Sequence, residues 1–192
     1  VAPERHSRPA VGVVATTGGG GAMAVDRLVL AGLDVPAPSG ATWEALSAAG
    51  VAAAHGRMVD LTLAGTRYYA IKAALDVMVR APEFDMVVFA AGSSARFDPE
   101  LSIAPAVDAA AEPGAVGRLA VFVVPEAPDA LARLAASGVP AFRAPESLAD
   151  ALGTALRRRP PRADFTISPP PDGPVETLDE AASYDLLEGL GI

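Results

Sequence analysis

The chain has 192 residues, of which 51% are hydrophobic, and its 15 basic and 23 acidic side chains give a net charge of −8. This length suffices for one α/β domain of good size plus an extension, and the apolar fraction suffices for a sizeable core. The acidic balance argues against a general nucleic-acid binder, because Lys and Arg must neutralise the phosphate backbone. We therefore expect a globular protein with no nucleic-acid partner.

Cysteine and histidine are scarce. The chain has no cysteine and only two histidines, His6 and His55, which excludes disulfides, thiolate nucleophiles and metal sites built from cysteines or several histidines. No apolar run is long enough to span a bilayer, and residues 1–9 lack the apolar core of a signal peptide. We therefore predict a cytoplasmic protein without a membrane partner and without a metal in this domain.

Strands and helices alternate over roughly the first 160 residues. Unbroken apolar runs predict buried parallel strands at residues 11–16, 85–91 and 119–124. Shorter strands are predicted at residues 33–35, 58–62 and 140–143. Helices are predicted at about residues 20–31, 42–49, 66–79, 99–111 (interrupted by Pro105), 128–136 and 145–159. This order predicts a parallel sheet with helices on both faces.

Two local predictions concern the first helices. In the helix at residues 20–31, Ala22, Val25 and Val29 recur at helical spacing and form its apolar face. Thr42 is a suitable N-cap for the next helix, because a threonine hydroxyl can accept a hydrogen bond from an unpaired N–H of the first turn.

The loops that follow the parallel strands should meet at one edge of the sheet. Right-handed crossovers place them there, and open α/β sheets bind ligands at this carboxyl edge. We expect residues 16–21, 60–62, 92–94 and 125–126 to converge. The candidate polar residues of this edge are Asp60, Thr62, Ser93 and Ser94.

The most distinctive of these loops is a glycine turn. Its residues, placed between a predicted strand and a predicted helix, are Thr16, Thr17, Gly18, Gly19, Gly20 and Gly21. Four glycines put no side chain between the backbone and a ligand, and a helix N-terminus offers unpaired N–H groups and the positive end of a dipole. The turn therefore suits a phosphate or another anion. The alternative is a tight turn that packs closely and binds nothing.

Familiar phosphate-binding motifs do not match this turn. A dinucleotide fingerprint needs a third glycine where Met23 stands, and an acid that residues 36–40 do not supply. A P-loop needs Gly-Lys-Ser/Thr, which residues 21–23 lack. The flavodoxin phosphate loop is faintly similar, but residues 92–95 hold no aromatic side chain to stack on a flavin. We therefore expect no nucleotide or flavin on this domain.

The remaining edge residues also have simple structural explanations. A polar pair such as Asp60 and Thr62 most often forms a turn or caps a helix. Ser93 or Ser94 could be a nucleophile, but no G-x-S-x-G surrounds them and His55 is the only plausible base. We therefore predict no catalytic residue in this chain.

Several stretches, taken in order, resemble one family. They are residues 11–26, 58–62, 68–91, 138–146 and 178–192. Together they are similar to the second succinyl-CoA-ligase-like domain of NDP-forming (ADP-forming) acyl-CoA synthetases and to the opening helix of the ATP-grasp domain that follows it. The chain departs from the family at Arg57 and Met58, where the family has Asn-Pro, and around residues 92–97.

The resemblance implies a fold and a domain order. The fold would be a three-layer, flavodoxin-like, doubly wound α/β domain with a mainly parallel sheet. The domains would be a flexible lead-in (1–9), the succinyl-CoA-ligase-like domain (10–159), a Pro-rich linker (160–177) and the start of a truncated ATP-grasp domain (178–192).

The resemblance also implies a function. The parent enzyme, an acid–thiol ligase, would convert an acid, CoA and ATP into acyl-CoA, ADP and phosphate through a phosphohistidine. CoA, ATP or ADP, Mg²⁺, phosphate and the histidine would lie on other domains, so this fragment would bind no cofactor and be inactive alone. Residues 16–21 would form the helix end that faces the phosphohistidine. The partners would be the CoA-binding, phosphohistidine and ATP-grasp domains of the same enzyme. A homo-oligomer of the enzyme is also possible under this resemblance.

A second interpretation comes from a different class of protein. The chain could serve as a non-catalytic anion-binding or interaction module of a fused regulatory protein, such as a protein acetyltransferase. An upstream Gly-His-Thr-Gly-like loop and an intact downstream ATP-grasp domain would favour the enzyme.

Overall fold

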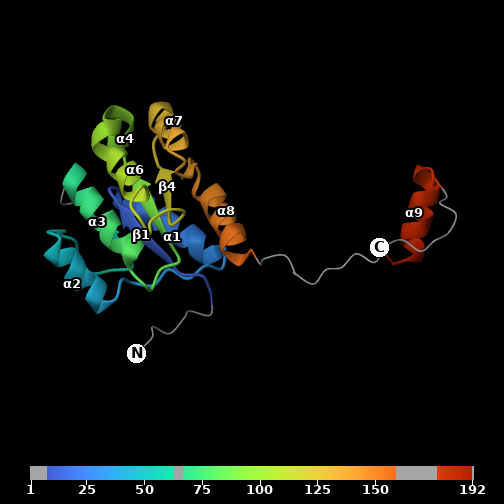
Figure 1. Ribbon diagram of the computed structural model, residues 1–192, viewed down its shortest axis with the longest axis horizontal. Coiled ribbons are helices and arrows are strands. Elements are labelled where there is room, and N and C mark those ends of the chain that lie inside the picture. Colours follow the sequence, from blue (N-terminus) through green and yellow to red (C-terminus); the bar gives the residue numbers. More distant parts are fainter. Residues whose placement is uncertain (1–7, 63–66, 159–176, 192) are drawn as a thin grey trace. The chain divides into compact units, whose positions relative to one another are not determined.

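The computed structural model describes residues 8–62, 67–158 and 177–191. It contains two compact units, Val1–Arg158 (unit 1) and Arg159–Ile192 (unit 2) (Figure 1). Unit 1 carries the sheet and all of the loops that were predicted to meet at its edge.

The sheet of unit 1 is parallel throughout. Its strands are β1 (Val11–Ala15), β2 (Met58–Asp60), β3 (Met86–Ala91), β4 (Leu119–Val123) and β5 (Ala141–Phe142). They follow the order β2-β1-β3-β4-β5, and Val13 of β1 lies opposite both Met58 and Val88. This order is that of flavodoxin-like doubly wound folds, which confirms the predicted fold class.

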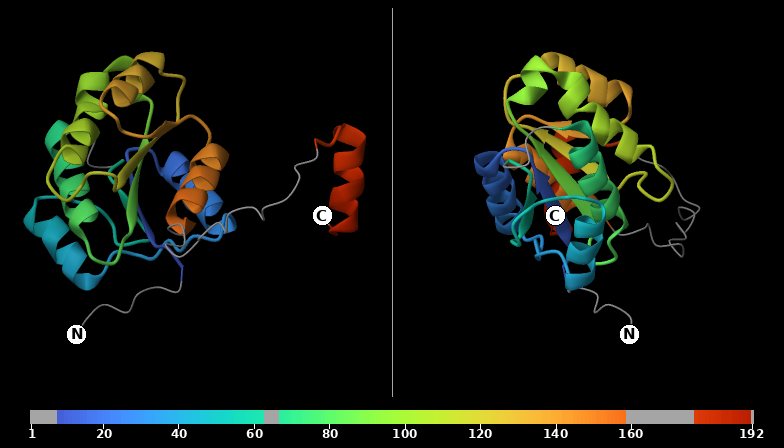
Figure 2. Two further views of the ribbon diagram at one scale, coloured as in Figure 1. Left: turned by 45° about the vertical axis from the view of Figure 1, so that its right-hand side comes forward. Right: turned by 90° about the vertical axis from the view of Figure 1, so that its left-hand side faces the viewer.

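Helices cover both faces of the sheet. They are α1 (Gly18–Leu30), α2 (Gly40–Ala48), α3 (Tyr68–Arg80), α4 (Ser94–Phe97), α5 (Pro99–Ser102), α6 (Ala104–Ala110), α7 (Pro128–Ala136) and α8 (Pro145–Arg157). One core lies between the sheet and α1 and α8, and another between the sheet and α2, α3, α6 and α7. Figure 2 shows these layers. Neighbouring residues of β1 alternate between the cores, since Val13 enters the first and Val14 the second.

The predicted face of α1 is wrong at two of its three residues, Ala22 and Val29, whereas Val25 is partly buried against the core on this side of the sheet. The helix begins at Gly18, and its buried residues are Gly20, Gly21, Ala24 and Leu28. Ala22 is exposed and Val29 is 43% exposed. Glycine permits a closer approach of the helix to the sheet than valine does, so the face that carries Gly20 and Gly21 packs inward.

The predicted cap of α2 is also wrong. Ser39 is the N-cap, and its hydroxyl accepts a hydrogen bond from the Thr42 N–H at 3.2 Å. The Thr42 hydroxyl instead donates to Glu83 Oε1 at 2.5 Å, across 41 residues of sequence. The predicted strand at residues 33–35 is reduced to a single parallel bridge between Ala10 and Asp34.

Other boundaries shift by only a few residues. Helix α7 has the predicted bounds. The predicted helix at residues 99–111 is divided at Ile103 into α5 and α6, and Pro105 lies in the first turn of α6. Ser94, predicted in a loop, is the first residue of α4. Thr66, the predicted start of α3, and most of the predicted linker lie outside the described residues.

Unit 2 contributes one described helix, α9 (Glu180–Gly189). Asp179 caps it by accepting a hydrogen bond from the Ala182 N–H at 2.9 Å. None of the residues of α9 is buried. Across the described ranges, no helix combines the length and apolar character needed to cross a bilayer.

Candidate anion site at the carboxyl edge

The glycine turn lies where the chain reverses its direction across the sheet. From β1 the chain crosses to β2, whereas from β3 it crosses to β4 on the opposite side. The carboxyl ends of β1 and β3 therefore flank the topological switch point, at which open α/β sheets bind ligands. The structure brings residues 16–21 and 92–94 together at this point, as predicted.

The first turn of α1 leaves backbone donors without an intrahelical partner. Thr17 is the N-cap, with an extended backbone (φ −147°, ψ 115°), and its side chain makes no capping hydrogen bond. The first helical bond runs from the Gly21 N–H to the Thr17 carbonyl oxygen at 2.9 Å. The N–H groups of Gly18, Gly19 and Gly20 precede that bond and thus point out of the helix end.

Gly20 and Gly21 serve packing. A Cβ on Gly20 would lie 2.7 Å from Thr17 Cγ2 and closer still to Val124 Cγ2. A Cβ on Gly21 would lie 2.6 Å from Met58 Sδ and 2.8 Å from Ala15 Cβ. Both glycines are buried. For this half of the turn, the close-packing interpretation is therefore correct.

Gly18 and Gly19 face a different environment. Gly19 is exposed, and a Cβ there would meet nothing within 4 Å. A Cβ on Gly18 would lie 3.4 Å from Asp60 Oδ2, an ordinary van der Waals distance. The backbone of these two residues is thus the part of the turn that an external anion could reach.

Thr16 joins the two loops of the switch point. Its hydroxyl oxygen accepts a hydrogen bond from the Gly92 N–H at 3.0 Å. A Cβ on Gly92 would lie only 3.1 Å from the Thr16 carbonyl oxygen and from Thr17 Cβ. The two loops therefore pack directly against each other, and Thr16 has a structural role in holding them.

Asp60 and Thr62 form the predicted turn interaction. Asp60 Oδ1 accepts hydrogen bonds from the Thr62 N–H at 2.9 Å and from the Thr62 hydroxyl at 2.5 Å. The other oxygen, Oδ2, is the one that lies near Gly18. A carboxylate beside a helix N-terminus stabilises the helix and weakens the attraction of that end for another anion. The sequence predicted that residues 16–21 and 60–62 converge, but it did not predict which atoms of Gly18 and Asp60 would meet.

The serine loop does not form a nucleophile–base pair with histidine. Ser93 and Ser94 follow β3 at the carboxyl edge, whereas His55 precedes β2 and so belongs to the opposite end of the sheet. The His55 ring is stacked on Trp43, with ring centroids 4.4 Å apart and planes 9° apart. His6 lies outside the described residues.

Two charged residues near this edge were not among the candidate site residues, although Glu126 lies in the loop at residues 125–126 that was predicted to reach the edge. Arg96, in the short helix after Ser94, lies with its guanidinium carbon 5.8 Å from the centroid of the Phe97 ring. Glu126, in the loop after β4, pairs with Arg143 at 3.6 Å. Only the tertiary structure shows which of these charges are paired.

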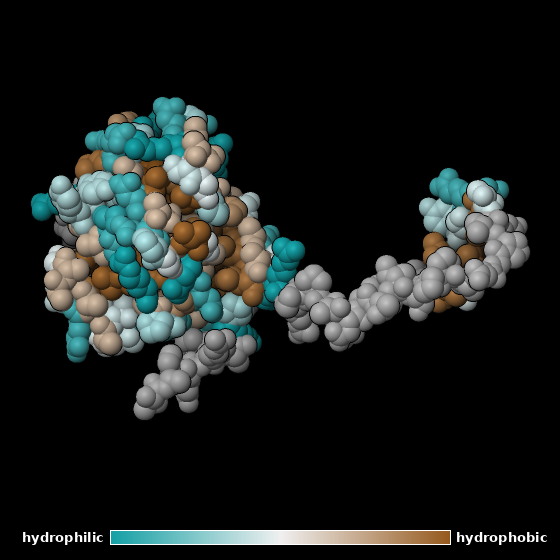
Figure 3. Space-filling model, in the orientation of Figure 1, coloured by the Kyte–Doolittle hydropathy of each residue, from teal (hydrophilic) through white to brown (hydrophobic). Residues whose placement is uncertain are grey.

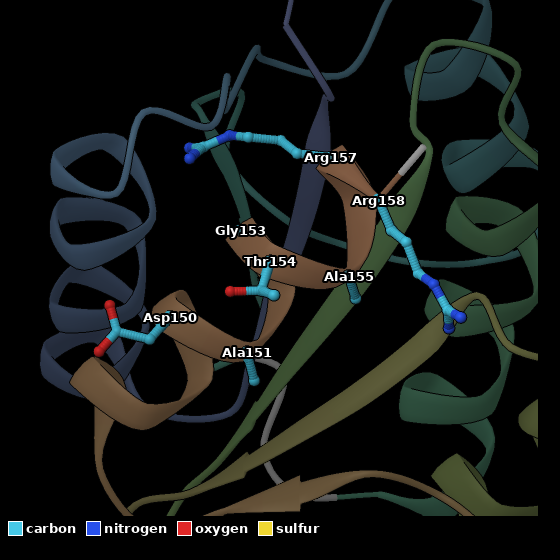
Figure 4. Close-up of a pocket in the computed structure, with 7 residues that line it drawn as sticks. All are labelled: Asp150, Ala151, Gly153, Thr154, Ala155, Arg157 and Arg158. Carbon is cyan, nitrogen blue, oxygen red and sulfur yellow. The ribbon is translucent and has the colours of Figure 1, made fainter. Parts of the chain in front are cut away.

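Another depression is remote from this edge. It has a volume of about 800 Å³ and lies over the second half of α8, between Asp150 and Arg158 (Figure 4). In Figure 4, Arg157 and Arg158 point in different directions, and Arg157 donates a hydrogen bond to the Ala31 carbonyl oxygen. No set of polar groups converges in it.

A smaller depression of about 360 Å³ adjoins the glycine turn. It lies between α1 and β2, and its lining includes Val25, Met58 and Asp60. Within the described ranges, no group of three His, Cys, Asp or Glu residues could hold a metal ion. Chemically, the carboxyl edge offers backbone N–H donors, the positive end of a helix dipole and the Asp60 carboxylate.

The chain matches no protein-family model and no curated protein sequence. Solved structures do resemble it. PH0766 from Pyrococcus horikoshii OT3 superposes with a TM-score of 0.64 at 20% identity, over 78% of this chain and 35% of that chain. The dinucleotide forming acetyl-coenzyme A synthetase 1 of Ca. Korarchaeum cryptofilum, in its apo form, gives 0.65 at 20% identity, over 78% and 33%.

The same synthetase in complex with phosphate and ADP gives a TM-score of 0.63 at 18% identity, over 76% of this chain and 32% of that chain. The chain thus spans about a third of the length of the solved structures it matches. At identities of 18–20%, the structural similarity shows that the chain and these proteins have a common fold. The chain therefore shares its fold with a part of these longer proteins.

Proposed function

We propose that the chain is a domain of an NDP-forming acyl-CoA synthetase, in which the N-terminus of α1 stabilises a phosphohistidine that another domain carries. The observation that carries the proposal is the open first turn of α1 at the switch point. Thr17 does not cap the turn, and Gly19 has no neighbour within 4 Å of a Cβ position. The resemblance in sequence and the likeness in fold to an acetyl-coenzyme A synthetase point to the same family.

The physical basis is the charge of the phosphoryl group. A phosphorylated histidine carries a dianionic group, which backbone N–H groups and a helix dipole can hold without a cationic side chain. The N–H groups of Gly18, which is half-buried, and of Gly19, which is exposed, would supply these donors. Gly20 and Gly21 would act indirectly, because they let α1 approach the sheet closely enough to fix the position of its first turn.

The other steps would belong to other domains. Conversion of an acid, CoA and ATP into acyl-CoA, ADP and phosphate needs sites for CoA, for the nucleotide with Mg²⁺, and for the histidine itself. We assign those sites to partner domains of the same enzyme. This domain would bind no cofactor and would be inactive alone. Residues 178–192 would open an ATP-grasp domain.

A second function is favoured by Asp60. Its carboxylate near Gly18 weakens the electrostatic attraction between the N-terminus of α1 and an anion. A domain in which this effect prevails would serve as a non-catalytic interaction or anion-binding module of a regulatory protein. In that case the intact protein would take up no phosphate from ATP on histidine.

The test uses Gly19, because a side chain there meets no steric obstacle. In the intact protein, Gly19→Asp places a carboxylate in the path of the phosphoryl group. We expect the steady-state level of acid-labile phosphohistidine formed from radiolabelled ATP to fall by at least about tenfold, which corresponds to about 1.4 kcal/mol.

Gly19→Asn and Gly19→Ala are the matched controls, since they add a side chain without charge. They should keep the phosphohistidine level within about threefold of the starting protein. Gly19→Asp should also unfold no more easily than these controls, because an acid in the first turn stabilises a helix by about 0.3–1 kcal/mol. An unchanged phosphohistidine level in Gly19→Asp would overturn the role assigned to the turn.

A further inference from the structure

A narrow apolar slot continues from the glycine turn along α1. Its volume is about 360 Å³, and its mainly apolar walls come from α1, from β2 and from the loop before β2. Ala22 and Val25 line its helical side, and Met58 lines its strand side. This volume lies at the lower end of the range for small-molecule pockets, about 300–1,000 Å³, so the slot suits one side chain rather than a coenzyme.

The slot and the candidate anion site share one face of α1. Gly18, Ala22 and Asp26 recur every four residues along the helix, and Ala22 and Asp26 line the slot. Asp60 joins the two sites, because it also lines the slot and its Oδ2 lies near Gly18. One helical turn, about 5.4 Å along the axis, separates Gly18 from Ala22. A group bound at the open turn would therefore lie about one helical turn from the slot.

Electrostatics alone hold an anion weakly at the open turn. The Asp60 carboxylate opposes the attraction of the helix dipole for an anion, and residues 16–21 include no cationic side chain. Apolar contact contributes binding that does not depend on charge. On the face of unit 1 seen in Figure 3, hydrophobic residues form small patches among hydrophilic ones. A partner therefore gains apolar contact at confined places rather than over one broad surface.

We propose that the slot receives a large apolar side chain of the segment that carries the phosphohistidine, one or two positions from the histidine. This contact, which rests on the proposed function, would position the partner domain. Neighbouring Cα atoms lie about 3.8 Å apart, and two residues of extended chain span at most about 7 Å. That reach matches the separation of Gly18 and Ala22. Because Asp26, Arg57 and Asp60 carry charges of both signs, the apolar walls rather than the charges select the occupant.

Cysteine labelling of the intact protein tests the contact, since this chain has no cysteine of its own. Ala22→Cys puts a small thiol in the slot, and Met23→Cys puts one at the neighbouring position, which is 50% exposed and lies outside the slot. Phosphorylation of the histidine by ATP should slow alkylation by N-ethylmaleimide at position 22 at least about fivefold, because the occupant blocks access to the thiol. Alkylation at position 23 should change less than about twofold. Peptide mass spectrometry would measure both rates.

Three further variants connect the protection to its cause. Gly19→Asp, combined with Ala22→Cys, should abolish the protection, since it lowers the phosphohistidine level that the protection requires. Ala22→Trp fills the slot and should lower the phosphohistidine level at least about tenfold, whereas Met23→Trp should keep it within about threefold.

The occupant is identified from the partner segment. Radiolabelled phosphate locates the histidine in the sequence of the intact protein. Alanine in place of the large apolar residue within two positions of that histidine should remove the protection at position 22. A non-hydrolysable ATP analogue should give no protection, because it phosphorylates nothing.

Four results would each overturn the proposal. They are no protection at position 22 or the same protection at position 23, equal phosphohistidine levels in Ala22→Trp and Met23→Trp, protection by the analogue, and a histidine segment that has no large apolar neighbour or keeps its protection without it. If any of these accompanies a lowered phosphohistidine level in Gly19→Asp, the slot contact fails alone. An unchanged level in Gly19→Asp, or no phosphohistidine in the intact protein, overturns the proposed function and the slot contact together.

Discussion

The two edges of the sheet in unit 1 use polar groups in opposite ways. At the amino edge, charged side chains bridge separate loops. Asp85 Oδ2 accepts a hydrogen bond from the Ala10 N–H at 2.8 Å, and Arg118 donates to the carbonyl oxygens of Ala81 and Phe84. Each of these charges satisfies backbone groups from a distant segment and so holds the fold together.

At the carboxyl edge the backbone itself is left available. The first turn of α1 has no side-chain cap, and Gly19 is exposed. The amino edge is thus built for stability, while the carboxyl edge lacks a side-chain cap that would be worth about 1 kcal/mol. Substitutions at the two edges should accordingly affect different measurements.

The largest effect on stability should come from Arg118. Arg118→Ala would leave the carbonyl oxygens of Ala81 and Phe84, both buried residues, without their charged donor. We expect the free energy of unfolding, measured in urea, to fall by about 2 kcal/mol. The control is Arg143→Ala at the carboxyl edge, where an exposed ion pair is worth less than about 1 kcal/mol. Equal losses in the two variants would refute the contrast between the edges.

A comparable loss is expected from the packed half of the glycine turn. Gly20→Ala would force a Cβ against Val124 and Thr17 and should cost about 2 kcal/mol of unfolding free energy. Gly19→Ala meets no obstacle and should stabilise α1 by up to about 1 kcal/mol, since alanine is a better helix former. Adding Val124→Ala should recover part of the Gly20→Ala loss. If Gly20→Ala proved neutral, the division of the turn into packed and open halves would be wrong.

Glu83 should make stability depend on pH. Burial by itself would raise the pKa of Glu83, but hydrogen bonds from the Thr42 hydroxyl and the Ser39 N–H outweigh it and hold the pKa below its ordinary value. A lowered folded-state pKa stabilises the fold above the unfolded pKa, about 4.3, and this contribution disappears as the pH falls through the folded value.

Glu83→Gln should therefore lower the free energy of unfolding by about 1 kcal/mol at neutral pH. The difference from the starting protein should shrink below about pH 4, as the carboxylate of the starting protein becomes protonated. Urea midpoints measured between about pH 3 and 8 would show this. A constant difference over that range would mean that the charge of Glu83 contributes nothing to α2.

The smallest effect should come from Asp60. Asp60→Asn keeps a side-chain oxygen for Thr62 and removes the charge near Gly18, so the loss of stability should be only about 0.5 kcal/mol. The same change should raise the phosphohistidine level of the intact protein, because less negative charge then opposes the phosphoryl group. Thermal unfolding and the radiolabel assay would measure the two effects. A lowered phosphohistidine level would show that the Asp60 carboxylate assists the site.

Much of unit 1 could be predicted from local sequence. Apolar runs located the three long strands. Prolines at helix starts and glycines after helix ends located most helices, including α7 with its observed bounds. The faces of helices were harder to predict. In α1 the apolar face suggested by Ala22 and Val29 is exposed, because the contact distance allowed by Gly20 and Gly21 decided which side packs inward.

The glycine turn shows the same division. Its position after the first strand and before a helix followed from the sequence, and the alternation of elements placed it at the carboxyl edge. Only the tertiary structure decided which glycines are packed, that Thr16 holds Gly92, and that Asp60 Oδ2 lies near Gly18. The contacts of Thr16 with Gly92 and of Gly18 with Asp60 join residues 40 or more positions apart, so no local pattern encodes them. The sequence by itself determined the order of strands and helices and the chemistry of the turn, because backbone preference and hydrophobic spacing are local properties. Long-range packing determined which backbone N–H donors of the turn remain exposed.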